Sequence, residues 1–179
     1  MTLYSYPQYR YRRWIGCLLL LLCLNVSGCL RYSFTGTSIP ADVNTIYIPF
    51  FEDRSGGGLG DLSDRLNSRL INRFVNQSRL AMTNDEDGAD AWLEGTIQGY
   101  TNRQFSIGGD EQANLNQVTI NVRGLFQYAS DDEPLWDKNF TGTGTYDVQE
   151  NPVDGEVAAA EEALQQIVNN MFNDAVSNW

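Results

Sequence analysis

Two segments with the apolar period of a helix stand on either side of long segments that alternate like strands, and this arrangement limits the folds open to the chain. In residues 59–76, leucine and phenylalanine recur every three or four positions. Residues 153–179 carry a broader apolar stripe at the same period. Such a stripe predicts a helix with one buried face. Each predicted helix therefore needs an apolar surface to pack on.

Four segments have the composition of strands. Residues 45–51 are rich in β-branched and aromatic side chains, and Pro49 within them predicts a strand that lies at an edge or ends there. Residues 91–105, 118–128 and 135–146 follow one another through short links, and apolar and polar side chains alternate along them. We expect these three to form an antiparallel meander.

Glycines and a short acidic segment carry further expectations. Gly95 and Gly99 lie on the apolar side of their predicted strand and indicate close approach by a helix. The last strand is expected to fray at Gly142 and Gly144. Residues 80–88 contain N-D-E-D-G but lack an acid at the first ligand position of a calcium loop, so a surface turn is predicted.

The elements occur in the order strand, helix, three strands, helix. The economical packing places both helices on one face of a four-stranded, mainly antiparallel sheet, an α+β two-layer sandwich. Removal of residues 1–28 leaves 151 residues, the size of one ordinary domain. We expect a signal at 1–28, a lipidated tether or short strand at 29–44, and a single domain at 45–179.

The N-terminus has the layout of a bacterial lipoprotein signal. A basic cluster precedes an apolar run of 11 residues, 14–24, which is shorter than a membrane-spanning helix. Small residues then lead to Cys29 in the pattern V-S-G-C, which is similar to a lipobox. We expect cleavage before Cys29, a diacylglycerol on its sulfur and an acyl chain on its amine. No other cofactor is expected.

Composition argues against several functions. The expected mature chain has 9 basic and 23 acidic residues, a net charge of −14, which disfavours nucleic acid and anionic lipid as electrostatic partners. Histidine is absent and Cys29 is the single cysteine left, so the commonest general base and metal ligand are missing. Acids at positions 85, 87, 131 and 132 fall in predicted turns, where acids are common. Neither an enzyme nor a metal site is predicted.

Three arginines form a basic stripe on the first predicted helix. Arg65, Arg69 and Arg73 are spaced four residues apart and therefore share one face. One interpretation is that they grip a phosphorylated ligand or an acidic partner through bidentate contacts. The other is a solvated helix face, on which Asp61 pairs with Arg65. Asp61 or Ser63 is expected to cap this helix.

Three motifs then resemble one family. The start G-C-L-R-Y-S-F-T-G, the run S-I-P-A-D-V-N-T-I-Y-I-P-F-F and the end V-S-N-W are similar to the LptE family of lipopolysaccharide-assembly lipoproteins, in the form found in Bacteroidota. The resemblance implies the same α+β sandwich. It also implies a non-catalytic, periplasm-facing outer-membrane lipoprotein that plugs an LptD-like β-barrel translocon and serves lipopolysaccharide transport. An auxiliary lipoprotein of a lipid-transporting ABC system is the alternative.

The resemblance further implies lipopolysaccharide contact through basic residues near the strand tips. Residues 101–116 of this chain offer only Arg103 there, beside Asp110 and Glu111. The outer sheet face is expected to present a polar and aromatic mixture suited to hydrogen-bonded contact, made of Trp92, Thr96, Gln98, Tyr100, Thr119, Asn121 and Arg123. The candidate contacts with lipopolysaccharide or the barrel are Arg65, Arg69, Arg73, Arg103, Trp92, Tyr100 and Arg123. Leu30, where an acidic residue favours inner-membrane retention in enteric bacteria, fits the outer membrane.

Overall fold

The computed structural model describes residues 39–105, 115–150 and 154–177, which all fall in one compact unit, Thr37–Trp179. The expected signal, Cys29 and most of the expected tether lie outside the described residues, as do Asp110 and Glu111. Among the helices of the described part, none combines the length and the hydropathy needed to cross a bilayer.

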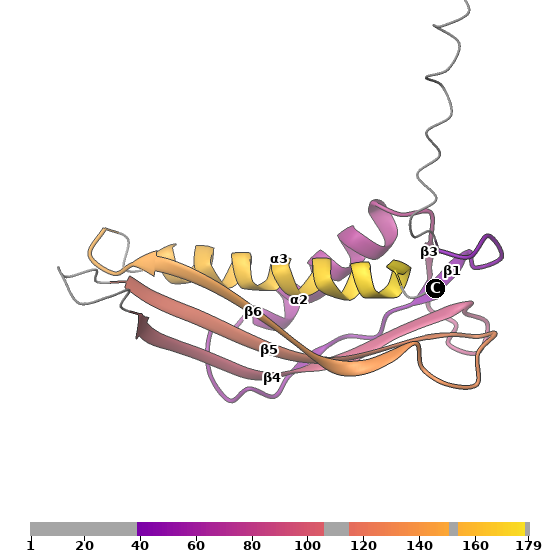
Figure 1. The fold of residues 1–179 in the computed structure, drawn as a ribbon, viewed down its shortest axis with the longest axis horizontal. Coiled ribbons are helices and arrows are strands. Elements are labelled where there is room, and N and C mark those ends of the chain that lie inside the picture. The colour runs from indigo at the N-terminus through magenta and orange to yellow at the C-terminus, as the bar shows by residue number, and fades with distance from the viewer. Residues whose placement is uncertain (1–38, 106–114, 151–153, 178–179) are drawn as a thin grey trace, which may run out of the picture. The chain divides into compact units, whose positions relative to one another are not determined.

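A six-stranded sheet forms one layer of this unit (Figure 1). Its order is β3-β1-β4-β5-β6, and β2 pairs with β4 beside this path. The strands β4, β5 and β6 form the predicted antiparallel meander, whereas β1, β2 and β3 join in parallel. The strands are β1 (Thr45–Tyr47), β2 (Glu52–Asp53), β3 (Ala81–Thr83), β4 (Ala91–Phe105), β5 (Leu115–Tyr128) and β6 (Trp136–Asp147).

The α+β class is confirmed, but the prediction of a four-stranded, mainly antiparallel sheet is wrong. The strand β3 lies in the segment 80–88 that was predicted as a turn, and β2 follows Phe51 directly. Both are too short to show an alternating pattern, and β3 is held by pairing with β1, far away in sequence. β1 ends two residues before Pro49, which agrees with the expectation that the strand ends there. It is not an edge strand, because it lies between β3 and β4.

The two predicted helices are present and cover the same face of the sheet. The first is α2 (Leu62–Ile71), which continues as the π-helical turn η1 (Asn72–Asn76), and the second is α3 (Asp154–Ser177). Phe74 of η1 packs against both the sheet and α3, which holds the two helices on the same face. Its ring lies 6.2 Å from that of Phe126 on β5 and 5.2 Å from that of Phe172 on α3. Asp61 occupies the N-cap position of α2 without a side-chain capping hydrogen bond.

The helix α3 packs directly on the backbone of β6. A β-carbon on Gly142 or Gly144 would collide with the carbonyl groups of Ala163 and Ala159 on the helix. The strand is continuous through both glycines, so the prediction that it frays there is wrong. Close helix approach was expected at Gly95 and Gly99, but their nearest neighbours are Phe51, Arg123 and Asn121, none of them on a helix.

A side-chain amide of α3 also occupies part of the free edge of β6. The backbone N–H of Thr143 donates to Oε1 of Gln166 at 3.1 Å, and Nε2 of Gln166 donates to the carbonyl of Thr143 at 2.8 Å. β6 is the last strand of the sheet, so these two backbone groups have no strand to pair with. Gln166 therefore satisfies them in the place of a neighbouring strand.

A bulge in β4 changes which side chains face the helices. The register with β5 shifts between Ile97 and Gly99, so one residue of β4 is left without a partner. Beyond the bulge, Tyr100 pairs with the fully buried Ile120, and its hydroxyl donates to Glu156 of α3 at 2.5 Å. The prediction that Tyr100 lies on the outer face is therefore wrong.

Alanine at Gly144 should destabilise the domain, because the new methyl group needs α3 to move away from β6. We expect Gly144→Ala to lower the free energy of unfolding by roughly 2 kcal/mol. Urea unfolding of the purified variant measures this. Gly57→Ala is the matched control, since nothing lies within 4 Å of a β-carbon there, and it should change stability by less than about 0.5 kcal/mol. Equal effects in the two variants would contradict the packing described for α3.

Candidate functional site

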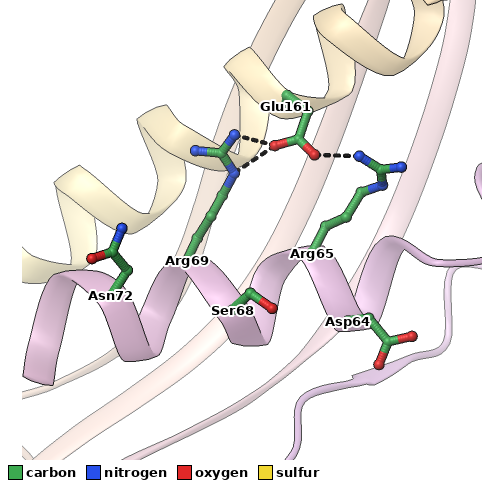
Figure 2. A pocket seen from close by; sticks show the side chains of 6 residues that line it. All are labelled: Asp64, Arg65, Ser68, Arg69, Asn72 and Glu161. Atoms are coloured by element: carbon green, nitrogen blue, oxygen red, sulfur yellow. Dashed lines mark hydrogen bonds and ion pairs between the residues drawn. The ribbon is translucent and has the colours of Figure 1, made fainter. Parts of the chain in front are cut away.

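Part of the predicted basic stripe lines an open groove between the two helices (Figure 2). The groove has a volume of about 450 Å³. Its walls come from α2, the start of η1 and α3, and the residues that line it are Asp64, Arg65, Ser68, Arg69, Asn72 and Glu161. Figure 2 shows Arg65 and Arg69 reaching from neighbouring turns of α2 toward Glu161 on α3.

One carboxylate of α3 binds two arginines of α2. Nη1 of Arg65 donates to Oε1 of Glu161. Nε of Arg69 donates to Oε2 of Glu161 at 2.7 Å, and its Nη2 donates to the same oxygen. The spacing of four residues places both guanidinium groups on one face of α2, and the contact between α2 and α3 supplies the acid. Arg69 also donates to Gln165, so the two helices are linked at several points.

The pKa values follow from these contacts. Burial raises the pKa of the Glu161 carboxyl, but hydrogen bonds from Arg69 and Arg65 outweigh it, so the pKa lies below its usual value. Hydrogen bonds to Asp61 and Glu161 raise the pKa of Arg65. Asp61 lies 2.6 Å from Nη2 of Arg65, which confirms the predicted pair. All three groups are therefore charged at neutral pH.

Arg73 belongs to the same stripe but not to the groove. Its guanidinium carbon lies 4.2 Å from the centre of the Phe172 ring, a cation–π geometry, and Nη1 donates to Gln77 at 3.0 Å. The prediction of a solvated helix face is thus wrong for Arg65 and Arg69, whose side chains are 28% and 27% exposed and engage α3. An anionic ligand in the groove would have to compete with Glu161 for both guanidinium groups.

The other candidate contacts lie apart from the groove. Arg123 forms a bidentate pair with Asp137 on β6, at 3.0 and 2.9 Å, and both lie on the outer sheet face. Nε1 of Trp92 donates to the carbonyl of Glu86 at 2.9 Å. Arg103 is exposed, and within the described part of the chain its side chain makes no hydrogen bond or ion pair. The structure therefore does not gather the seven candidates into one site.

No cluster of metal-ligating type joins these residues. In the ranges that the structure describes, no group of three or more histidine, cysteine, aspartate or glutamate side chains is placed to hold a metal ion. The arrangement that is present holds helices together and offers polar groups at two surfaces, the interhelical groove and the outer sheet face.

Glu161 is the main residue that sequence reasoning missed. In the sequence it is one of several acids near the start of the last predicted helix, where the helix dipole favours them. Its partners lie more than 90 positions earlier in the chain. No local pattern carries that information, because the pairing depends on how one helix is placed against the other.

A family model matches most of the described chain. The model for LptE, with the description lipopolysaccharide-assembly, matches residues 43–177 and so includes both helices and every strand. This chain belongs to the LptE family. It is a lipopolysaccharide-assembly lipoprotein by family, as the opening and closing motifs of the sequence had indicated. No curated protein sequence matches this LptE-family chain significantly.

Solved structures are similar to this LptE-family protein at low sequence identity. A protein from Xanthomonas campestris has 15% identity and a TM-score of 0.53, with 76% of this chain and 87% of that chain covered. The PelC dodecamer from Paraburkholderia phytofirmans has 11% identity and a TM-score of 0.49, with 80% of this chain and 96% of that chain covered. A minor lipoprotein from Acinetobacter baumannii has 11% identity and a TM-score of 0.45, with 76% of this chain and 98% of that chain covered. At such identities the first of these supports the fold alone.

Removal of the Glu161 charge should lower stability in a pH-dependent way. Because the native pKa of Glu161 is lowered, its stabilising effect is complete above the unfolded pKa of about 4.3 and is lost as pH falls through the native pKa. We expect Glu161→Gln to lower the free energy of unfolding by about 1 kcal/mol at pH 7, since the pair is partly exposed. The difference from the wild type should shrink steadily as pH falls below the unfolded pKa.

Urea unfolding at several pH values measures this difference. Glu162→Gln is the matched control, because Glu162 is exposed and adjacent but lies outside the groove. It should stay close to the wild type at every pH. A Glu161→Gln deficit that is the same at pH 7 and pH 3 would mean that the ion pair is not its cause.

Proposed function

We propose that this LptE-family protein is a non-catalytic outer-membrane lipoprotein that faces the periplasm and acts as the plug and assembly partner of an LptD-like β-barrel in lipopolysaccharide transport. The observation that carries the proposal is the family match over residues 43–177. It extends over the whole sandwich rather than a short motif. We therefore assign the assembly role of the family to the whole folded domain.

The surface of the sandwich suits such a position. Large β-barrels have polar interiors, so a protein inside one needs polar side chains where it meets the wall. In the described part of the chain, both helices lie on one side of the sheet, and no helix or strand covers the other side of β4, β5 and β6 (Figure 1). That side carries threonine, asparagine and glutamine rather than a large apolar stripe.

The lipid anchor has a separate role in this proposal. A diacylglycerol on the Cys29 sulfur together with an acyl chain on its amine would hold the protein at the periplasmic leaflet of the outer membrane. A tethered domain meets a barrel in the same membrane at a high effective concentration. The anchor thus promotes the encounter, while the folded domain makes the contact.

Recovery of a partner tests the proposal. The full-length lipidated protein, purified in mild detergent from a cell that makes lipopolysaccharide, should carry a large outer-membrane β-barrel with it. A Cys29→Ser form produced as a soluble domain and mixed with the same extract is the control for detergent artefacts. Recovery of inner-membrane permease and ATPase subunits instead would favour the ABC-system alternative, and recovery of neither partner would reject the plug.

Loss of the anchor should separate attachment from folding. Cys29→Ser is expected to leave the circular dichroism spectrum and the unfolding midpoint of the domain unchanged, because residue 29 precedes the described fold. The protein should move from the membrane fraction to the soluble periplasmic fraction. Membrane fractionation with immunoblotting measures this, and unchanged fractionation would contradict the assignment of Cys29 as the lipidated residue.

A further inference from the structure

The side of the sheet opposite the helices contains a block of short, uncharged polar side chains. On β4, β5 and β6, partner residues form rows across the three strands, and three neighbouring rows define what we call the central outer face. It consists of Arg103, Gln117 and Thr145, of Thr101, Thr119 and Thr143, and of Gly99, Asn121 and Thr141.

Charge is the property that sets this face apart. The chain has a net charge of −11, yet none of the nine positions of the central outer face is acidic and Arg103 is its one basic residue. Beyond the row of Asn121, Arg123 and Asp137 neutralise each other through their bidentate pair. Beyond the row of Gln117, Asp147 accepts hydrogen bonds from the backbone N–H groups of Gln149 and Glu150. Depletion of charged residues is typical of the core of a protein–protein interface, whereas solvated surfaces of an acidic protein usually carry carboxylates.

The side chains of the central outer face can also bind a partner at a low cost in conformational entropy. Five of the nine are threonines, whose β-branched side chains lose little rotamer freedom when a partner binds. The hydroxyl of Thr141 donates to Oδ1 of Asn121 at 2.6 Å, which fixes both groups. Within the described residues, the hydroxyls of Thr101, Thr119 and Thr143 make no hydrogen bond to the protein. They are therefore available to a partner.

Aromatic side chains lie at the far end of this side of the sheet, away from the central outer face. Tyr47 and Trp92 are partners in neighbouring strands and lie on this side of the sheet, since Ile46 and Leu93 beside them point into the core. Phe50, a few residues further along, is 59% exposed while Phe51 is fully buried. The charged side chains of Glu94, Arg123 and Asp137 lie between this aromatic group and the central outer face, so the two are separate parts of the same side of the sheet.

From the low charge and the hydroxyl and amide groups of this block we infer that the central outer face is the surface through which the protein contacts the lumenal wall of its β-barrel partner. The inference rests on the proposed function and specifies the surface used. The inner wall of a barrel presents polar side chains from alternate strand positions, and neutral hydroxyl and amide groups can pair with donors and acceptors of either sign. A net acidic protein thereby avoids repulsion from acidic groups on that wall.

Other occupants fit this face less well. Lipopolysaccharide phosphates call for clustered cations, and here Arg103 stands alone because Arg123 is held by Asp137. A second copy stacked sheet on sheet would need interdigitating apolar side chains, which the nine positions lack. The polar wall of a barrel needs neither.

Introduction of acids on this face tests the inference. Thr119→Glu combined with Thr141→Glu places two carboxylates in the block, and both positions are on the sheet surface rather than in the core. We expect at least about tenfold less barrel to co-purify with the lipidated full-length variant, because desolvated carboxylates would face the wall without partners. Ala158→Glu combined with Asn170→Glu adds the same charge on exposed positions of α3 and should leave barrel recovery unchanged.

Crosslinking gives a readout that does not depend on tolerance of the charges. A photoreactive phenylalanine analogue at Thr119 should yield a covalent adduct with the barrel in intact cells, and the same analogue at Ala158 should not. Thermal unfolding of each variant shows whether it is folded. If the wild type recovers the barrel but Thr119 gives no adduct and the double acid variant still binds, the barrel docks elsewhere and the inference is wrong.

Other outcomes reject the inference in identifiable ways. An adduct from Thr119 to a second copy of the chain would assign the face to self-association. Loss of binding to purified lipopolysaccharide in the Thr119→Glu and Thr141→Glu variant, with barrel recovery intact, would assign it to the lipid. Failure of the wild type itself to recover any barrel rejects the proposed function instead, so the two failures are distinguishable.

Discussion

The fold depends on direct contact between the backbone of α3 and the backbone of β6. Gly142 and Gly144 permit this contact because a β-carbon at either position would meet a helix carbonyl group. The close approach brings the apolar stripe of α3 onto β5 and β6, where Ile120, Val122 and Phe140 are buried. It also sets where Glu161 and Gln166 fall relative to α2 and the sheet edge. The two glycines of β6 thus determine the position of α3, the longest helix in the described residues.

Electrostatic contacts refine this packing rather than create it. Glu161 binds Arg65 and Arg69 at once, so a single acid replaces water for two guanidinium groups in the partly buried space between the helices. Arg73 continues the same line of contact by stacking on Phe172. The basic stripe, for which the sequence left a ligand site and a solvated face as the two interpretations, thereby has a structural role in joining α2 to α3. On the outer sheet face the comparable pair, Arg123 with Asp137, joins two neighbouring strands rather than two helices.

Sequence patterns predicted what repeats along the chain and missed what depends on distant pairing. The stripes of α2 and α3 and the alternation of β4, β5 and β6 are local, and they gave those elements within a few residues. β2 and β3 are two and three residues long and exist through parallel pairing with strands distant in sequence. The bulge before Gly99 leaves no mark in composition, yet it moves Tyr100 to the opposite face. The candidate residues were found individually, but their grouping required the tertiary structure.

The amide of Gln166 has a consequence for how this protein can meet other sheets. An edge strand of twelve residues would ordinarily be a template onto which another strand could add. Gln166 already holds both backbone groups of Thr143, so an incoming strand would have to break two hydrogen bonds in the second half of β6 before it could extend along the edge. These two hydrogen bonds oppose the addition of a strand at this edge. The protein can therefore lie beside unpaired strands of a neighbour without joining their sheet, and its broad face stays open for reversible contact.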